Sequence, residues 1–311
     1  MVRKIKYQKL NAFTAKGSLG NPAAVLYMQA GQSSPKLSEE EMQQIAREHG
    51  DFVSEVVYCV RKRDAIHLTF YSSEGEVDFC GHGTIACMYS LIKDTLKLME
   101  RSTIAIETNR KGKLTVYNEI AAHDAVMVAA PKPVYMGMNI ERETIADNLG
   151  IAPDIIRANL PVELIDAGLR TLIVPIDSLL DEVSIHPGEN RLKVFCETEG
   201  IDTVLIYSLG VADRGCIAHT RVFAPRFGYL EDPATGSGNS AFGYYMIKNR
   251  LWDGKNCRIE QGPGHGGYNS ILLGTSEGEV LFGGSATLCI DGVYCLEDLY
   301  MGSAESLSPA G

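Results

Sequence analysis

The chain has 311 residues, of which 45% are hydrophobic and 22% are charged, and its formal net charge is -10 at pH 7. This balance is typical of a globular protein with enough apolar material for two domains of ordinary size. The negative charge and the lack of dense Lys/Arg clusters argue against a nucleic-acid-binding surface, and no stretch approaches the ~20 apolar residues of a membrane helix.

The N-terminal segment runs directly into a strand-like pattern, without the apolar region and cleavage site of a signal peptide. The eight cysteines are scattered along the chain and form no CxxC pair. This usage is typical of a reduced protein and not of a disulfide scaffold. We therefore expect a cytoplasmic protein.

The first half is predicted to contain mostly strands, with one helix before a Gly-rich turn and one after it. Ser38 and Glu41 form a capping box at the start of the first helix, which runs to about residue 48. The second helix is predicted from about Thr84 to Leu96, after the turn at 80–84. The predicted strands cover residues 21–27, 55–59, 65–71, 103–108 and 114–117.

The second half repeats this order. A second Gly-rich turn at 232–238 leads into a helix predicted from about Ser240 to Asn249. We align Ile106-Glu107-Thr108 with Ile259-Glu260-Gln261, Phe70 with Phe223, and Gly81 with Gly236, and this agreement indicates an internal repeat. The predicted strands cover 169–174, 204–207, 218–223, 257–261 and 271–273, followed by a further pair at 280–281 and 292–295.

Each half is therefore predicted as an α+β unit, a curled and mainly antiparallel sheet around its own long helix. The helix after each Gly-rich turn would bury its apolar face against the sheet of its own half. The Pro-punctuated stretch at 129–133 is the predicted linker. We expect an N-terminal domain at 1–128, to which final strands near 285–300 can return, and a C-terminal domain at 134–284. The residues expected in the core are Ile85, Ala86, Met88, Leu91, Ile92, Ala241, Phe242, Tyr245 and Met246.

The two Gly-rich helix starts are the candidate site. A helix N-terminus offers unsatisfied N–H groups and a partial positive charge, which together bind anions, and glycine lets a ligand approach the backbone. Two such ends facing one cleft can hold a carboxylate while charge develops on a neighbouring carbon. The turns match neither a phosphate loop nor a dinucleotide fingerprint, and a plain helix cap is the alternative for either turn alone.

Several motifs give the chain a resemblance to the PhzF-like phenazine-biosynthesis protein family. The resemblance extends from about residue 5 to residue 296, and Glu231-Asp232-Pro233-Ala234-Thr235-Gly236-Ser237-Gly238 is its most specific segment. It implies a diaminopimelate epimerase-like fold: two similar domains, each a β-barrel-like antiparallel sheet around a central α-helix, with the active site in the cleft and a homodimer as the assembly. The other motifs are those at 21–25, 54–57, 78–84, 221–225 and 259–262.

Glu55 is the predicted proton-transfer residue. It starts an apolar strand, and our alignment of Tyr58 with Tyr207 places it opposite Val204, so that this acid exists in one half only. An acid at an otherwise apolar position has its pKa raised by desolvation, which suits it to general acid/base work. A surface glutamate is the alternative from the residues alone, and the family resemblance implies the catalytic role.

The resemblance assigns the remaining roles. Asp232 contributes to positioning or proton transfer, where a helix-dipole acid is the simpler alternative. His82 orients the substrate or shuttles a proton, where a structural histidine is the alternative. Ser237 donates its hydroxyl to the substrate. The backbone around the helix starts is expected to bind the substrate through Gly81, Gly83, Thr84, Gly236 and Gly238.

Cys80 is treated separately. In amino-acid racemases of this fold a cysteine in the first turn is one of two catalytic thiols, and a helix N-terminus lowers a thiol pKa. The second turn carries Asp232, Pro233 and Ala234 where the partner thiol would lie. A two-thiol mechanism is therefore incomplete, and Cys80 is predicted to be structural or ancillary. A metal site from Cys80, His82 and Cys87 is not expected, because it lacks a second ligand pair.

The leading prediction is an isomerase that needs no cofactor or metal and moves a proton on a small anionic carbon acid, as in the allylic hydrogen shift of the family's phenazine enzymes. One alternative is an epimerase or racemase that uses Cys80, and another is a non-catalytic interaction protein on an enzyme fold. Many family members have a Gly-Arg-Pro-Ser run where this chain has residues 264–270, so the substrate can differ from theirs.

Overall fold

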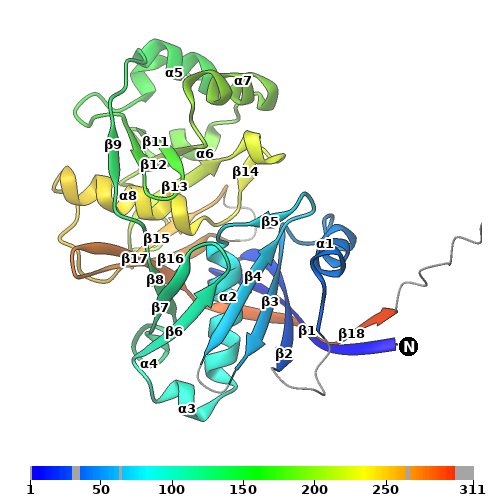
Figure 1. Ribbon diagram of the computed structural model, residues 1–311. Coiled ribbons are helices and arrows are strands. Elements are labelled where there is room, and N and C mark those ends of the chain that lie inside the picture. Colours follow the sequence, from blue (N-terminus) through cyan, green and yellow to red (C-terminus); the bar gives the residue numbers. More distant parts are fainter. Residues whose placement is uncertain (1, 30–35, 63–64, 264–266, 298–311) are drawn as a thin grey trace, which may run out of the picture.

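The first half of the chain forms a mixed sheet that curls around one long helix (Figure 1). The computed structural model describes residues 2–29, 36–62, 65–263 and 267–297. The helices of this half are α1 (Glu39–Glu48), α2 (Gly81–Lys93), α3 (Leu96–Met99) and α4 (Ile120–His123). Its strands are β1 (Val2–Ala12), β2 (Asn21–Gln29), β3 (Glu55–Arg61), β4 (Ile66–Tyr71), β5 (Glu76–Val77), β6 (Thr103–Thr108), β7 (Gly112–Asn118) and β8 (Val126–Ala129).

The second half has the same plan around α8 (Gly236–Lys248), with additional helices on its outer face. These are α5 (Arg142–Leu149), α6 (Leu179–Ser184) and α7 (Glu189–Glu199), with 3-10 turns η1 (Pro153–Ile155) and η2 (Pro225–Phe227). The strands are β9 (Val134–Met136), β10 (Glu163–Asp166), β11 (Arg170–Pro175), β12 (Thr203–Ser208), β13 (Cys216–Phe223), β14 (Glu231–Asp232), β15 (Cys257–Gln261), β16 (Asn269–Ser276), β17 (Glu279–Gly284) and β18 (Ala286–Glu297).

The predicted repeat appears in the strand pairing. In the first half β2 is parallel to β3, β3 is antiparallel to β4, and β4 is parallel to β6, which continues antiparallel through β7 to β8. In the second half β11, β12, β13, β15, β16 and β17 pair in the same order and with the same directions. The final strand of each series, β8 and β17, pair with one another and join the two sheets.

The C-terminal strand crosses to the first half. β18 pairs antiparallel with β1 along its length, and β9 pairs with β10 in the equivalent place of the second half. The predicted pairing of strands 280–281 and 292–295 is therefore wrong, because β17 pairs with β16 and β8 while β18 pairs with β1. The domain boundaries at 128 and 134 stay a prediction.

The registers correct our alignment of the halves by one residue. Val56 faces Tyr71 across β3 and β4, and Val204 faces Phe223 across β12 and β13. Glu55 therefore corresponds to Thr203 and not to Val204, and Phe223 corresponds to Tyr71 and not to Phe70. Because a slip of one residue moves a side chain to the other face of a sheet, only the pairing settles such an alignment.

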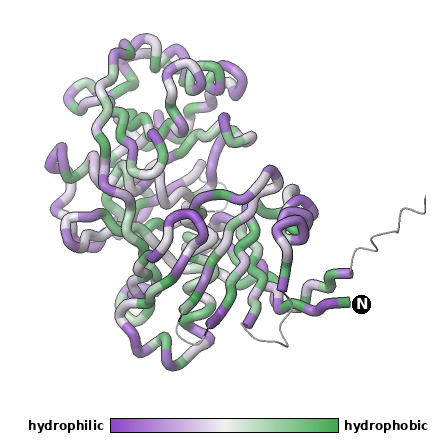
Figure 2. The backbone as a smooth tube through the Cα atoms, viewed as in Figure 1, coloured by the Kyte–Doolittle hydropathy of each residue, from purple (hydrophilic) through white to green (hydrophobic). Residues whose placement is uncertain are grey.

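Both central helices begin earlier than predicted. Cys80 and Thr235 are the N-caps, so the glycines that we expected to precede the helices occupy their first turns. Every residue predicted for the core of α2 and α8 is buried. The capping box of Ser38 and Glu41 is present in α1. Figure 2 shows apolar stretches along the inner strands and central helices, and hydrophilic stretches in α1 and the outer turns. In the described part of the chain no helix is long and apolar enough to cross a membrane.

Candidate active site

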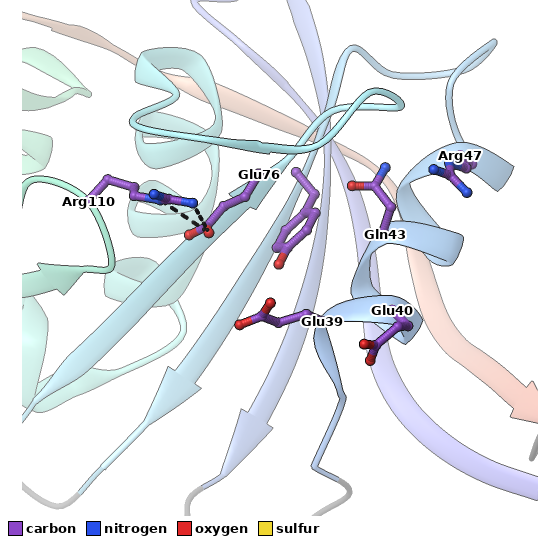
Figure 3. Close-up of a pocket in the computed structure, with 7 residues that line it drawn as sticks. Glu39, Glu40, Gln43, Arg47, Glu76 and Arg110 are labelled. Atoms are coloured by element: carbon purple, nitrogen blue, oxygen red, sulfur yellow. Dashed lines mark hydrogen bonds and ion pairs between the residues drawn. The ribbon is translucent and has the colours of Figure 1, made fainter.

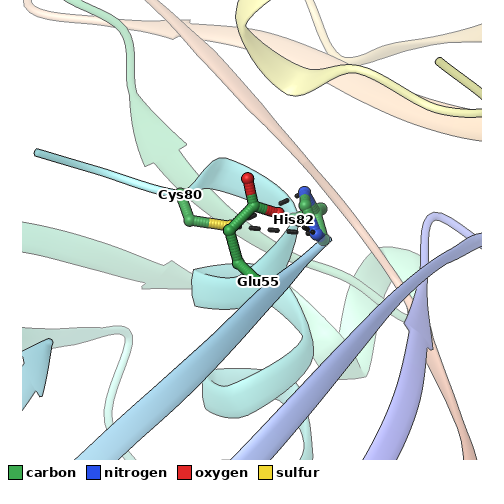
Figure 4. A group of neighbouring side chains, drawn as sticks. All are labelled: Glu55, Cys80 and His82. Carbon is green, nitrogen blue, oxygen red and sulfur yellow. Dashed lines mark hydrogen bonds and ion pairs between the residues drawn. The ribbon is translucent and has the colours of Figure 1, made fainter. Parts of the chain in front are cut away.

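The start of α2 brings together three of the predicted residues. Glu55 opens β3, Cys80 caps α2, and His82 lies in its first turn, so that their side chains converge from two elements (Figure 4). His82 Nε2 lies 3.3 Å from Glu55 Oε2. The Cys80 thiol lies 3.6 Å from His82 Nδ1 and 3.8 Å from His82 Nε2. An acid, an imidazole and a thiol therefore share one small volume.

Glu55 Oε2 is a buried acceptor that lacks a hydrogen bond of good geometry within the described residues. The imidazole of His82 is near it, but the contact is an ion-pair distance and not a hydrogen bond. Buried carboxylate oxygens normally have a partner, since an unpaired one costs free energy. Such an oxygen is well placed to accept a proton from a bound molecule.

Cys80 acts as the cap of α2. Its thiol accepts a hydrogen bond from the N–H of Gly83 at 3.2 Å. The pKa of Cys80 is raised well above its ordinary value, mainly by burial and then by the negative charge of Glu55. A buried neutral thiol is a weak nucleophile and a poor base, because the thiolate is the reactive form. This environment agrees with the predicted structural or ancillary role.

The amides of Gly83 and Thr84, which we expected to bind the substrate, already donate hydrogen bonds within the protein. The N–H and the hydroxyl of Thr84 both donate to Cys80 O, at 3.0 and 2.8 Å, and the N–H of Gly83 donates to the Cys80 thiol. The amides of both residues therefore have partners within the protein, and their substrate-binding role stays a prediction. Gly83 has a steric role, since an added Cβ would lie 2.7 Å from Val57 Cγ2 and 2.9 Å from Cys80 Sγ.

The start of α8 is less capped than that of α2. Thr235 makes no side-chain hydrogen bond to the helix, so the first-turn amides of Gly236, Ser237 and Gly238 have no side-chain cap from it. Ser237 is partly exposed, and its hydroxyl has no hydrogen bond within the described residues. This end of α8 therefore keeps the capacity to bind an anion.

Asp232 ends β14 just before α8. Its Oδ1 accepts hydrogen bonds from Asn21 Nδ2 at 2.8 Å and from the N–H of Ala234 at 3.2 Å. Burial raises the pKa of Asp232 to about 6, with the charge of Glu55 acting in the same direction and His82 opposing it. Asp232 therefore responds electrostatically to both site residues of the first half, and it can hold a proton near neutral pH.

A polar frame that we did not predict holds the turn before α8. Asn21 also donates to Ala234 O at 2.8 Å, so a first-half strand fixes a second-half turn. Gln261 donates to Asp232 O at 2.9 Å and accepts from the N–H of Thr235 at 2.9 Å. Asn269 donates to Pro233 O at 2.6 Å. Asn21 and Gln261 lie in motifs of the resemblance, but their spacing in the sequence gives no sign of these partners.

Next to Asp232 in β14, Glu231 forms a partly buried ion pair with Arg221. The Arg221 guanidinium is 2% exposed and donates to both Glu231 oxygens, at 2.9 and 2.8 Å. It also donates to the carbonyls of Glu182 and Ile185 near the end of α6. This bidentate pair fixes β14, and with it the position of Asp232.

Tyr229 is a further neighbour of the site that the sequence analysis missed. Burial and then the charges of Asp232, Glu55 and Cys80 raise its pKa. It follows η2 and the left-handed Gly228, and its side chain remains 38% exposed. Tyr229 lies between a glycine and the acidic motif, where no hydrophobic periodicity predicts its position. Only the folded chain shows that it is near the carboxyl groups of the site.

A separate groove lies on the other side of the first sheet, between α1 and β4–β5 (Figure 3). Its volume is about 400 Å³, and it holds none of the predicted site residues. Its charges are largely balanced, since Arg110 pairs with Glu76 at 3.0 Å. The groove is lined by Glu39, Glu40, Gln43, Arg47, Tyr71, Glu76 and Arg110.

The model of the family described as phenazine biosynthesis-like protein matches residues 10–292. The chain belongs to this family. An uncharacterized isomerase of Clostridium acetobutylicum is 27% identical over 81% of this chain and 82% of its own length. A phenazine biosynthesis-like domain-containing protein of Bos taurus is 29% identical over 91% of this chain and 96% of its own. The predicted membership in the PhzF-like family is confirmed.

Solved structures support the fold. A phenazine biosynthesis protein of the PhzF family from Bacillus anthracis superposes with a TM-score of 0.79 at 24% identity, covering 94% of this chain and 99% of that one. A hydroxyproline epimerase from Agrobacterium vitis superposes with a TM-score of 0.53 at 12% identity, covering 96% and 94%. The predicted diaminopimelate epimerase-like fold is confirmed, and so is the enzyme class of isomerase. Residues 264–266 of the segment that differs from the family lie outside the described residues.

Proposed function

We propose that this member of the phenazine biosynthesis-like family is a cofactor-independent isomerase that shifts a proton on a small anionic carbon acid. Glu55 accepts the proton from one carbon, the electron pair of the broken C–H bond moves into the neighbouring double-bond system, and Glu55 returns the proton to another carbon. Nothing is oxidised or reduced in this sequence. The substrate carboxylate is held by the open helix start at Gly236 and Ser237.

The observation that carries this proposal is the pairing of two unlike carboxyl groups across the halves. Glu55 has a buried oxygen that lacks a hydrogen bond within the described residues and lies 3.3 Å from His82 Nε2, and Asp232 has a pKa raised to about 6 by burial. An acid that can hold a proton near neutral pH is suited to a donor role, and a buried oxygen without a hydrogen bond is placed to accept a proton. Asp232 can then donate a hydrogen bond to the anionic substrate while Glu55 moves the proton.

Glu55→Gln tests the proposal, with Glu107→Gln on β6 as the matched control. A panel of small anionic carbon acids is first screened by thermal shift, and hits are incubated in D2O and followed by NMR. We expect Glu55→Gln to lose at least ~10²-fold in exchange and isomerisation rate, because general acid/base catalysis contributes that much or more. A folded Glu55→Gln variant that turns over at the wild-type rate would show that another residue moves the proton.

The alternative function is a Cys80-dependent epimerase. The contacts of the Cys80 thiol suggest a variant that distinguishes it from the proposed isomerase. Serine can accept the Gly83 N–H in place of the thiol, so Cys80→Ser preserves the cap. The proposal requires this variant to keep turnover within about tenfold of wild type, well short of the ~10²-fold loss of an essential acid or base. A larger loss, accompanied by deuterium at a stereocentre, would favour the epimerase.

The homodimer stays a prediction from the family resemblance, and the cytoplasmic location stays a prediction from the cysteine usage and the N-terminal pattern. Light scattering on the purified protein measures the assembly directly. The non-catalytic alternative is disfavoured by the relatives that are named isomerases and by the set of ionisable groups at the site.

A further inference from the structure

The three side chains at the start of α2 have a second chemical property besides proton transfer. A carboxylate oxygen of Glu55, a ring nitrogen of His82 and the sulfur of Cys80 all lie within 4.8 Å of one another. These are three of the usual ligand types of zinc. They come from two elements, since Glu55 starts β3 while Cys80 and His82 lie two positions apart at the α2 start.

The distances between the ligand atoms fit a tetrahedral ion. Zinc binds oxygen and nitrogen at ~2.0–2.1 Å and thiolate at ~2.3 Å, so regular tetrahedral angles separate O from N by ~3.3 Å and S from N by ~3.6 Å. Here Glu55 Oε2 lies 3.3 Å from His82 Nε2, and Cys80 Sγ lies 3.8 Å from the same nitrogen. The third pair, Glu55 oxygen and Cys80 Sγ, lies within 4.8 Å, so the side chains must draw together to close the three ligands on one ion.

The surroundings of these atoms suit a cation. Glu55 Oε2 is buried and has no hydrogen bond within the described residues, and its near neighbour is the ring of His82, so an ion between them would satisfy both groups. The sulfur already accepts the Gly83 N–H, a contact that also suits a thiolate. Thiolate and imidazole together select zinc over magnesium or calcium, and three protein ligands leave one position open.

We infer that Glu55, His82 and Cys80 form a binding site for Zn²⁺, with the fourth position open toward Asp232. Metal binding at this site can be measured without knowing the substrate. Its effect on turnover does rest on the proposed function: an ion bound to Glu55 occupies the oxygen that accepts the proton. Zinc is therefore an inhibitor of the isomerase, and the enzyme free of metal is the active form.

Titration of the metal-free protein with Co²⁺ tests the site, because a cobalt–thiolate bond gives a charge-transfer absorption band. The starting protein carries Cys289→Ser and Cys295→Ser, since these exposed thiols would bind metal on their own. In this background we compare Cys80→Ser with Cys87→Ser, a buried thiol of the same helix. Zn²⁺ affinity is measured by competition against the bound Co²⁺.

We expect one Co²⁺ per chain, with a thiolate band that is present in Cys87→Ser and absent in Cys80→Ser. His82→Gln and Glu55→Gln should weaken Zn²⁺ binding by more than the ~10–100-fold that loss of an outer-shell partner costs. Failure to bind Co²⁺ stoichiometrically, or a thiolate band that survives in Cys80→Ser, would overturn the site. Zinc binding without inhibition would leave the site standing and would contradict the role of Glu55.

Discussion

Asp232 is held in a state that favours its neutral form. Burial raises its pKa to about 6, with the charge of Glu55 acting in the same direction, and outweighs the opposing effects of His82 and of hydrogen bonds from Thr235 and Ala234. A carboxyl group with a raised pKa in the native state opposes folding at pH values where it is ionised. Such a cost is common at functional sites, where chemistry and stability have different requirements.

Asp232→Asn is expected to stabilise the protein above neutral pH. The native pKa of about 6 lies above the ordinary 3.8, so the favourable contribution of the protonated acid is complete below pH ~4 and is lost as the pH rises through 6. The asparagine variant does not ionise, so its advantage should approach roughly 2–3 kcal/mol at pH 8 and vanish near pH 4. Urea unfolding, followed by the fluorescence of Trp252, measures both proteins at each pH.

Asp94→Asn is the control for this comparison, because its partner Lys6 is 3.8 Å away and both groups are largely exposed. It should change the free energy of unfolding by less than ~1 kcal/mol at every pH. Equal stability of Asp232→Asn and wild type at pH 8 would mean that Asp232 is not desolvated as the structure indicates.

At the scale of elements, one aromatic ring sets the distance between the two helix starts. Phe282 of β17 is 2% exposed and packs against the first residue of each central helix. A Cβ added to Gly236 would lie 2.3 Å from the Phe282 ring, and one added to Gly81 would lie 3.1 Å from it. Packing against Phe282 therefore restricts Gly236 strongly and Gly81 mildly, independently of any ligand that approaches their amides.

Gly236→Ala should destabilise the protein more than Gly81→Ala. A contact of 2.3 Å forces the Phe282 ring to move, and overpacking of this kind costs ~1–3 kcal/mol. The milder contact at Gly81 should cost less than ~1 kcal/mol. Thermal unfolding of both variants gives the ranking, and Phe282→Leu in the Gly236→Ala background should recover part of the loss. The reverse ranking would mean that the ring does not fill the space before α8.

At the scale of the whole molecule, the two halves are joined by the pairing of β8 with β17 and by the return of β18 to β1. The close approach at the first junction depends on Gly283, which faces Met127. An added Cβ at Gly283 would lie 1.9 Å from Val126 O and 2.6 Å from Met127 Cα. Backbone atoms cannot turn aside as a side chain can, so this position admits only glycine.

Gly283→Ala is expected to lower the free energy of unfolding by more than ~3 kcal/mol, because the two sheets must separate locally to accept the methyl group. Gly292→Ala on β18 is the matched control, since nothing lies within 4 Å of its added Cβ. Urea unfolding of both variants tests this. A Gly283→Ala protein as stable as Gly292→Ala would show that the β8–β17 junction is looser than described.

The sequence alone determined the features that depend on local pattern. Apolar periodicity identified the buried faces of α2 and α8, the capping box identified the start of α1, and the repeated order of elements identified two similar α+β halves. Glu55, His82 and Asp232 stood at the starts of an apolar strand and of two Gly-rich helices, and the family resemblance implied their roles in the site. These signals span only a few residues each, so the chain carries them without tertiary contacts.

Tertiary structure alone decided what depends on register and on distant contacts. The pairing of β3 with β4 and of β12 with β13 showed that Glu55 corresponds to Thr203, where the sequence could not distinguish neighbouring alignments. Asn21 holds Asp232 across the halves, and Phe282 explains the paired glycines, though neither residue lies near its partners in the chain. The distances among Glu55, Cys80 and His82 likewise follow from how β3 packs on α2, and these distances make a zinc site of residues that the sequence indicated only for proton transfer.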